Sequence, residues 1–309
     1  MDIDLVYLWV DGNDPQWLVR RNEFFGIQYS SDETNCKGRY ANNDELKYSL
    51  RSVEKNIPWV RKIFIVTDGQ IPEWLNTQNP KIQIVDHSQI LPVEAMPCYN
   101  ASVIECFLGR IPDLSEHFLF ANDDMFANKQ LTPDFFFSDD GLPIVRLKRK
   151  IFGKLRYFIK KSINKKLDTY RSLLYLSAQR IQSITGKYYT GIPHHNIDSY
   201  CKSDFNMVID RFKDEVMVSQ EHHIRHKDDF HRSAISYYVL ATKRGWLKYV
   251  KKTESYRIPV HKPDFMKYIR RYNPQLFCLN DSQYANEKDR ERIQPFLENM
   301  FPISSKFEK

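Results

Sequence analysis

Two adjacent acids follow an apolar run in the first half of the chain, at Asn122-Asp123-Asp124. The run before them, from His117 to Ala121, has the composition of a buried strand. Carboxylates at the end of such a strand offer hard oxygen ligands to a divalent cation that binds a diphosphate. The same tripeptide is also common as a turn with a helix-capping acid, so by itself it leaves both interpretations open.

Histidines form the second chemical signal. The segment Pro193-His194-His195-Asn196-Ile197-Asp198 places imidazoles near a carboxylate, and such a histidine can act as a general base because its pKa lies near working pH. Further histidines follow at His222, His223, His226 and His231. Histidines on the surface or satisfied within a core are the commoner outcome, so spacing alone selects none of them.

An arginine later in the chain offers a phosphate clamp. Arg225 lies in a charged stretch, residues 224–229, and its guanidinium can bind phosphate oxygens bidentately and balance the charge of a transferring phosphoryl group. An ordinary ion pair with Asp228 or Asp229 is the plainer alternative.

A further acid closes another apolar run. Residues 277–280 are followed directly by Asp281. The carboxylate of Asp281 can complete a metal shell begun by Asp123 and Asp124. Asn-Asp is also a common turn, and the spacing does not separate these alternatives.

Strands that alternate with helices must position these residues. Apolar strand-like runs occur at 4–10, 62–67, 82–85 and 117–121, and each ends in polar residues. Helical spacing of apolar residues predicts helices at 46–57, capped by Asn42 or Asn43, and at 102–110, 229–243 and 286–300, where Pro295 can break or kink the last. The pattern predicts an α/β fold with a Rossmann-like, nucleotide-sugar-transferase-type, mainly parallel sheet. Ligands bind such sheets at the carboxyl ends of the strands, where Asp11 and Asp14 follow the first run.

Positive charge is concentrated in one segment. Residues 146–166 hold ten Lys/Arg and no acid, in a chain of net charge +7, with apolar residues on a helical stripe. We expect a basic amphipathic helix within an insertion, residues 146–190, that divides a catalytic core into halves 1–145 and 191–309. Such a helix, Arg146 to Lys166, fits an anionic membrane surface or another polyanion better than nucleic acid, and a solvated lid helix is the alternative.

Several classes are disfavoured by what the sequence lacks. The five cysteines form no CxxC pair, which speaks against a disulfide framework or a cysteine zinc site. The acidic N-terminus and the absence of a long apolar segment predict a cytoplasmic protein, peripheral at the inner face of the plasma membrane if the basic helix docks there. No P-loop, GxGxxG, GxSxG or HExxH motif occurs.

Taken in order along nearly the whole chain, the motifs resemble the Stealth family, which includes bacterial capsule polymerases and the catalytic subunit of the lysosomal-enzyme N-acetylglucosamine-1-phosphotransferase. The similar blocks are residues 3–15, residues 39–124, Pro193-His194 with 225–229, and residues 277–281 with the ending 300–303. The basic segment matches no block of the family.

The resemblance implies that hexose-1-phosphate, for example N-acetylhexosamine-1-phosphate, passes from a nucleotide sugar to a hydroxyl of a free or lipid-linked glycan. A phosphodiester in a capsular or cell-surface polysaccharide and a nucleoside monophosphate result. Matched residue by residue, the roles fall on Asp124, His194 and Arg225 for catalysis and on Asp123, Asp124 and Asp281 for Mg²⁺ or Mn²⁺, with Asp11 and Arg51 as donor-binding candidates.

Three alternatives stay open at this point. A metal-dependent glycosyltransferase uses the same donors but attacks the sugar carbon and releases a nucleoside diphosphate. His194 can instead attack phosphorus and form a phosphohistidine. A non-catalytic membrane- or polyanion-binding protein would use the basic helix and leave the acids as solvated turns.

Overall fold

The computed structural model describes residues 1–26, 29–30, 32–150, 152, 155, 159 and 168–309. Its centre is a five-stranded sheet in the order β3-β2-β1-β4-β8. Four strands run parallel, namely β1 (Ile3–Leu8), β2 (Ile63–Thr67), β3 (Ile82–Asp86) and β4 (His117–Asn122), and β8 (Asp198–Cys201) pairs antiparallel with β4. The predicted mainly parallel α/β fold is therefore confirmed.

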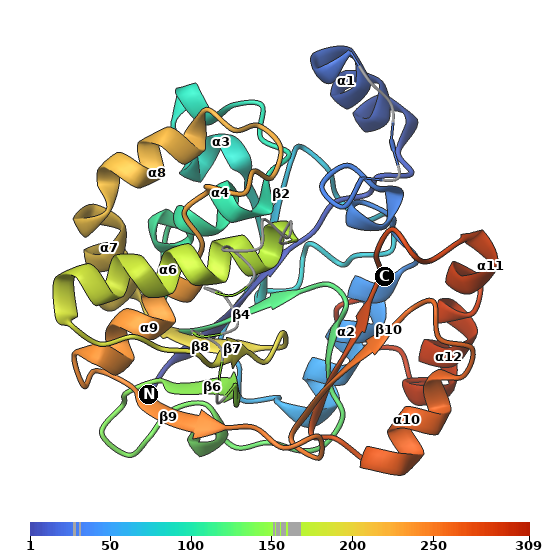
Figure 1. Ribbon diagram of the computed structural model, residues 1–309. Helices are drawn as coiled ribbons and strands as arrows, with labels where there is room; N and C mark the ends of the chain where they lie inside the picture. The colour runs from blue at the N-terminus through green and yellow to red at the C-terminus, as the bar shows by residue number, and fades with distance from the viewer. Residues whose placement is uncertain (27–28, 31, 151, 153–154, 156–158, 160–167) are drawn as a thin grey trace.

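Successive residues of each strand point to opposite faces of the sheet. Both faces are covered, because the residues on each face enter an apolar core. In β4, Phe118 and Phe120 belong to one apolar core, whereas Leu119 and Ala121 belong to another. Figure 1 shows helices gathered on the two corresponding sides. One side carries α3 (His87–Ile90), α4 (Ala101–Cys106), α6 (Thr169–Thr185), α7 (Lys202–Arg211), α8 (Lys213–Gln220) and α9 (Ser233–Ala241).

The opposite side is covered by α2 (Glu45–Asn56), whose Leu46, Leu50 and Val53 lie in the second core. This helix follows the predicted spacing but begins after Asp44, and no side chain caps its N-terminus, so the expected Asn42 or Asn43 cap was wrong. Helix α1 (Pro15–Phe25) stands at the edge of the molecule, with Asp14 as its N-cap.

Two small sheets flank the main one. The first joins β10 (Ser255–Pro259), β11 (Leu276–Asn280) and β5 (Met125–Ala127), and it brings the last third of the chain beside the end of β4. The second joins β7 (Ile192–Pro193), β6 (Ile144–Lys148) and β9 (Trp246–Tyr249). Helices α10 (Phe265–Tyr272), α11 (Glu287–Arg290) and α12 (Ile293–Met300) pack beside the first.

The predicted helix at 286–300 is two helices, α11 and α12. The break lies at residues 291–292, before Pro295, which occupies the first turn of α12. Proline is tolerated there because the amide that it lacks has no partner within the helix.

Much of the predicted amphipathic helix Arg146 to Lys166 lies outside the described residues. Parts of the wider 146–190 region that are described contribute to the core, where Leu147 of β6 and Ala178 and Ile181 of α6 are buried together. The domain division at 146–190 stays a prediction. No helix among the described residues is both long and apolar enough to cross a membrane.

Candidate active site

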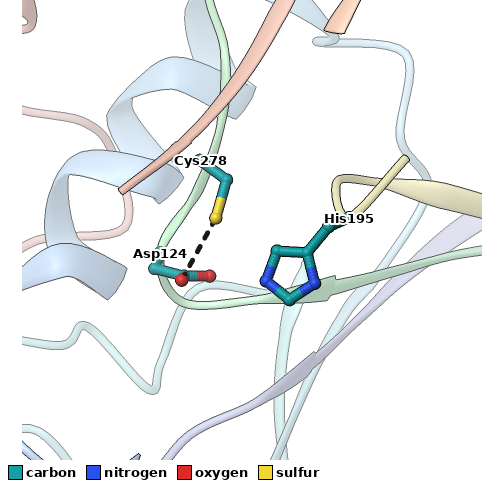
Figure 2. A group of neighbouring side chains, drawn as sticks. All are labelled: Asp124, His195 and Cys278. Carbon is teal, nitrogen blue, oxygen red and sulfur yellow. Dashed lines mark hydrogen bonds between the residues drawn. The ribbon is translucent and has the colours of Figure 1, made fainter. Parts of the chain in front are cut away.

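The acidic turn between β4 and β5 is the centre of the candidate site. The amide of Leu279 donates to the carbonyl of Asp124 at 2.9 Å, which ties the turn to β11. The thiol of Cys278 lies 3.2 Å from Oδ2 of Asp124 (Figure 2). The other oxygen, Oδ1, is buried and has no hydrogen-bond partner in the described part of the chain, so one lone-pair face of this carboxylate is left open.

His195 lies beside the same pair. The nearest ligand atoms of Asp124, His195 and Cys278 are all within 4.8 Å of one another, and Figure 2 shows the imidazole lying toward the carboxylate and the thiol. His195 adopts a left-handed backbone conformation, with φ of 59°, in the turn between β7 and β8. Its Nε2 is 3.4 Å from Nδ2 of Asn280.

Charge and burial set the protonation of these groups. Burial raises the pKa of Asp124 to about 7, helped by the nearby carboxylates of Glu45 and Asp281 and opposed by the hydrogen bond from Cys278. Burial also lowers the pKa of His195 well below its usual value, and the cations Arg257, Arg232 and Lys148 act in the same direction. The imidazole is therefore neutral at pH 7, which leaves one ring nitrogen with a free lone pair.

Acids surround one side of the turn. Burial, Glu45 and Asp124 raise the pKa of Asp123 well above its usual range. Glu45, the first residue of α2, is itself buried with a raised pKa, and Asp281 contributes to that shift. The raised pKa values indicate that too little positive charge lies near these carboxylates to stabilise their ionised forms.

Basic residues lie on the other side. Burial and the neighbouring Arg257 lower the pKa of Lys148 to about 8. Arg257 donates to Oδ1 of Asn280 at 3.2 Å, and Lys148 ends strand β6. His195 thus has both acidic and basic residues near it, and a bound cation with a diphosphate requires groups of both signs.

The donor set around the turn fits a hard cation. Burial raises the pKa of the Cys278 thiol well above that of free cysteine, so the sulfur keeps its proton and donates to Asp124 rather than acting as a thiolate ligand. The open Oδ1 of Asp124 and the adjacent Asp123 carboxylate are the oxygen ligands that Mg²⁺ or Mn²⁺ prefers.

His194, the histidine expected to react, is instead fully buried. Its Nδ1 is 2.8 Å from the hydroxyl of Ser255, and its Nε2 is 2.9 Å from Oδ1 of Asp198. Asp198 in turn pairs with Arg232 at 2.6 Å. Both ring nitrogens of His194 are engaged within the core, and it is the neighbouring His195 that lies beside Asp124.

Asp281 lies near the acidic group, but its carboxylate is already bound. Arg290 donates to its two oxygens at 2.7 and 3.2 Å, and the amide of Ser282 donates at 2.6 Å. A side chain at Gly38 would come within 2.6 Å of the same carboxylate. These contacts hold Asp281 in place and leave it fewer free lone pairs than Asp124.

Arg225 is half-buried in the segment between α8 and α9, and among the described residues it makes no hydrogen bond or ion pair. Its positive charge, after burial, lowers the pKa of Arg39 to about 10. Arg39 donates to the carbonyl of Glu33 at 2.9 Å. Two neighbouring guanidinium groups, one of them without an anionic partner, favour a bound anion.

The two donor-binding candidates have different surroundings. Asp11, beyond the end of β1, accepts from the amide of Asn13 at 2.9 Å, and its backbone is held by Gln70. Arg51 is buried, pairs with Glu308 at 2.8 Å and donates to the carbonyl of Phe301. The contacts of Arg51 tie α2 to the C-terminal segment, which favours a structural role.

Sequence reasoning passed over His195, Cys278, Glu45, Lys148 and Arg257. Cys278 lies in an apolar strand and gave no polar signal of its own, and Lys148 was noted only as part of the basic segment. Glu45 stood within a predicted helix. His195 was visible in the sequence, but only the turn in which it lies decides which of two adjacent histidines faces the acids.

By fold, the chain is an α/β protein, and the candidate site lies where strand β4 of its mainly parallel sheet ends. Family models described as Stealth protein conserved regions 1, 2 and 4 match residues 1–24, 39–145 and 267–309. The exopolysaccharide phosphotransferase cps2G of Lactiplantibacillus plantarum is 32% identical, covering 100% of this chain and 96% of that protein. The chain therefore belongs to the Stealth family, and it is an enzyme that transfers phosphate-containing groups.

Other relatives carry similar names. The receptor polysaccharide phosphotransferase WefC of Streptococcus oralis is 29% identical over 99% of both chains. The exopolysaccharide phosphotransferase CpsY of Mycobacterium leprae is 35% identical, and the match covers this chain fully but 57% of that protein. Among solved structures, the galactosyltransferase LgtC is similar with a TM-score of 0.47 and 14% identity over 98% of both chains.

Proposed function

We propose that this enzyme transfers a hexose-1-phosphate from a nucleotide sugar to a glycan hydroxyl in the synthesis of a capsular or other surface polysaccharide. The hydroxyl oxygen bonds to the phosphorus that carries the sugar, and the bond from that phosphorus to the oxygen of the departing nucleoside monophosphate breaks. The product is a phosphodiester. The relatives named as capsular and exopolysaccharide phosphotransferases support this assignment.

The acidic side of the site would hold the cation. Asp124, through its open Oδ1, and Asp123 are proposed as ligands of Mg²⁺ or Mn²⁺, with Asp281 and Glu45 close behind. When bound, the ion would neutralise charge on the diphosphate. Its presence would also relieve the repulsion among the carboxylates and lower their pKa values.

The basic side would hold the phosphates. Lys148 and Arg257 lie around His195, and Arg225, without an anionic partner among the described residues, is proposed to bind an oxygen of the transferring phosphoryl group. Most of the catalysis of phosphoryl transfer comes from such alignment and charge balance.

His195 is proposed as the general base. A neutral imidazole beside the acidic turn can take the proton of the acceptor hydroxyl as that oxygen attacks phosphorus. The observation that carries the proposal is that His195 lies within 4.8 Å of Asp124, with the cations Lys148 and Arg257 also near its ring.

Product analysis tests the reaction. The purified protein would be incubated with a panel of nucleotide sugars, a glycan acceptor and Mg²⁺ or Mn²⁺. A nucleoside monophosphate and a phosphodiester signal in ³¹P NMR support the proposal. A nucleoside diphosphate would instead identify a glycosyltransferase, and retention of configuration at phosphorus would favour a covalent phosphohistidine over direct attack.

We also propose that an anionic lipid surface is a partner, because an apolar and basic surface is exposed beside the Arg146 to Lys166 segment. Trp246, Leu247 and Tyr249 of β9 are 58%, 39% and 46% exposed. Arg149 lies 5.7 Å from the centre of the Tyr249 ring, which joins β9 to the start of the basic segment. Aromatic rings beside lysines and arginines suit the headgroup region of a membrane.

A further inference from the structure

A second cluster of metal-ligating side chains lies in the segment between α8 and α9. Ligand atoms of His222, His226 and Asp229 all lie within 4.8 Å of one another. His222 Nδ1 is 2.7 Å from Oδ1 of Asp229, and the two imidazole rings are 4.3 Å apart between centroids. This cluster includes none of the residues around Asp124.

The carboxylate of this cluster is held rigidly. Asp229 is fully buried, and its Oδ2 accepts from the backbone amide of His226 and from Nδ2 of Asn100, both at 2.8 Å. Oδ1 faces His222. His226 is exposed, so one side of the cluster is open to an ion that arrives from solvent.

Two imidazoles and one carboxylate are a ligand set that suits zinc and similar borderline cations, because magnesium and calcium prefer oxygen. Two atoms that bind one zinc ion at about 2.0–2.1 Å lie roughly 3 Å apart. The 2.7 Å separation of Nδ1 and Oδ1 in the His222–Asp229 pair needs only a small adjustment to meet this geometry. The ion would take the place of the proton that these two atoms share.

The surrounding charges allow such an ion. Asp228 lies 3.7 Å from Nδ1 of His226 and can supply a fourth ligand or balance charge. Arg180 donates to the backbone carbonyls of Asp228 and Asp229 rather than to the carboxylates. Asp229 of the cluster and the neighbouring Asp228 together carry two negative charges, so a divalent ion would be neutralised locally.

We propose that His222, His226 and Asp229 form a site for a divalent transition metal such as Zn²⁺, separate from the cation site at Asp124. Because Arg225 lies between the two histidines in the chain, an ion that joins them would fix the segment that carries the proposed phosphate-binding guanidinium. The metal would act as a clip on this segment and take no part in bond breaking. Only this consequence for Arg225 depends on the proposed function.

Metal binding itself is the test, and it needs no substrate. The full chain, stripped with a chelator, would be titrated with Zn²⁺ by calorimetry and with Co²⁺ by visible absorption. We expect His222→Asn and His226→Asn to weaken the binding at least about tenfold. Asp124→Asn, which alters the other site, should leave it unchanged. His223→Asn is the matched control, because His223 neighbours the cluster but binds the carbonyl of Pro97.

A second measurement reports the effect on the segment. Trypsin can cut after Arg225 and Lys227, and Zn²⁺ should slow those cuts in the wild type but not in His226→Asn. Since His226 is exposed, its replacement should preserve the fold, which thermal unfolding would check. Equal Zn²⁺ affinity in the wild type and the His222→Asn/His226→Asn double variant would overturn the proposal, as would loss of that binding in Asp124→Asn.

Discussion

The thiol of Cys278 donates to Oδ2 of Asp124 across 3.2 Å, and it is the only hydrogen bond that an Asp124 carboxylate oxygen makes to a side chain among the described residues. This bond favours the ionised carboxylate and opposes the burial that raises the pKa of Asp124 to about 7. Cys278, which the sequence alone indicates as an ordinary core residue, thus lowers the pKa of Asp124.

The first prediction concerns pH. Asp124 must be ionised to hold a cation, so metal-dependent turnover should fall as pH drops toward and below 7, with bound metal moving the midpoint downward. Cys278→Ala removes the bond that lowers this pKa, so the acid limb of kcat/KM should move to higher pH. Cys278→Ser keeps a donor and should stay closer to the wild type. Coincident profiles for the alanine variant and the wild type would contradict this role of the thiol.

The second prediction concerns stability without metal. The pKa of Asp124 is raised in the folded state, so ionisation at high pH destabilises the metal-free protein, and this cost fades as pH falls toward the ordinary aspartate value. Asp124→Asn should therefore raise the free energy of unfolding at pH 8 by about 1 kcal/mol or more, with a smaller gain near pH 4.5. Denaturant titration with a chelator present measures it. The same variant should have no turnover. If Asp124→Asn is less stable than the wild type at pH 8, ionised Asp124 does not destabilise the metal-free protein.

The third prediction separates the two adjacent histidines. His195→Gln should reduce kcat about 10²- to 10⁴-fold with little loss of stability, because its imidazole is proposed to move a proton. His194→Gln should lower the free energy of unfolding by about 1–3 kcal/mol, because it disturbs a buried pair with Asp198. Kinetics and thermal unfolding of the two variants, measured in parallel, check both. The reverse pattern would restore His194 as the reactive residue.

The fourth prediction compares two arginines. Arg225→Met should lower kcat/KM about 10²-fold or more while stability is kept, because among the described residues this guanidinium has no partner to lose. Arg51→Met should destabilise the fold by about 3–5 kcal/mol, because Glu308 would be left without its main buried partner. Steady-state kinetics and chemical denaturation distinguish them. Unchanged turnover in Arg225→Met would remove that residue from the proposed site.

The fifth prediction concerns lipid. Replacing Trp246 and Tyr249 with alanine, or reversing four basic charges within 149–166, should weaken binding to vesicles that contain anionic lipid by several-fold, with turnover on a soluble acceptor preserved. Sedimentation with anionic and with neutral vesicles measures this. If both variants bind anionic vesicles as the wild type does, the docking proposal fails.

The strands of the parallel sheet were predictable because each is an apolar run that ends in polar residues. The segments predicted at 62–67 and 82–85 became β2 and β3 with ends shifted by one residue. Strands β5 and β9 gave no such signal, because β5 is only three residues long and every residue of β9 is exposed. Such strands form because of pairing partners that lie elsewhere in the chain.

The candidate site was predictable in part for the same reason. Asp123, Asp124 and Asp281 follow apolar runs, and the electrostatic influence of Asp281 on Asp124 places these acids near each other. Which of His194 and His195 lies beside Asp124 was not predictable. The left-handed backbone conformation of His195, in the turn between β7 and β8, places its ring there. The lone thiol of Cys278 likewise carried no signal within an apolar strand.

The hydrogen bond from Leu279 to the carbonyl of Asp124 joins positions that are far apart in the chain. During synthesis the acidic turn therefore emerges long before the strand that shapes it. A nascent chain that has already formed the parallel sheet still lacks the wall made by β11, so the centre is completed as one of the last events of folding. Newly made copies would then acquire this geometry only after β11 has left the ribosome.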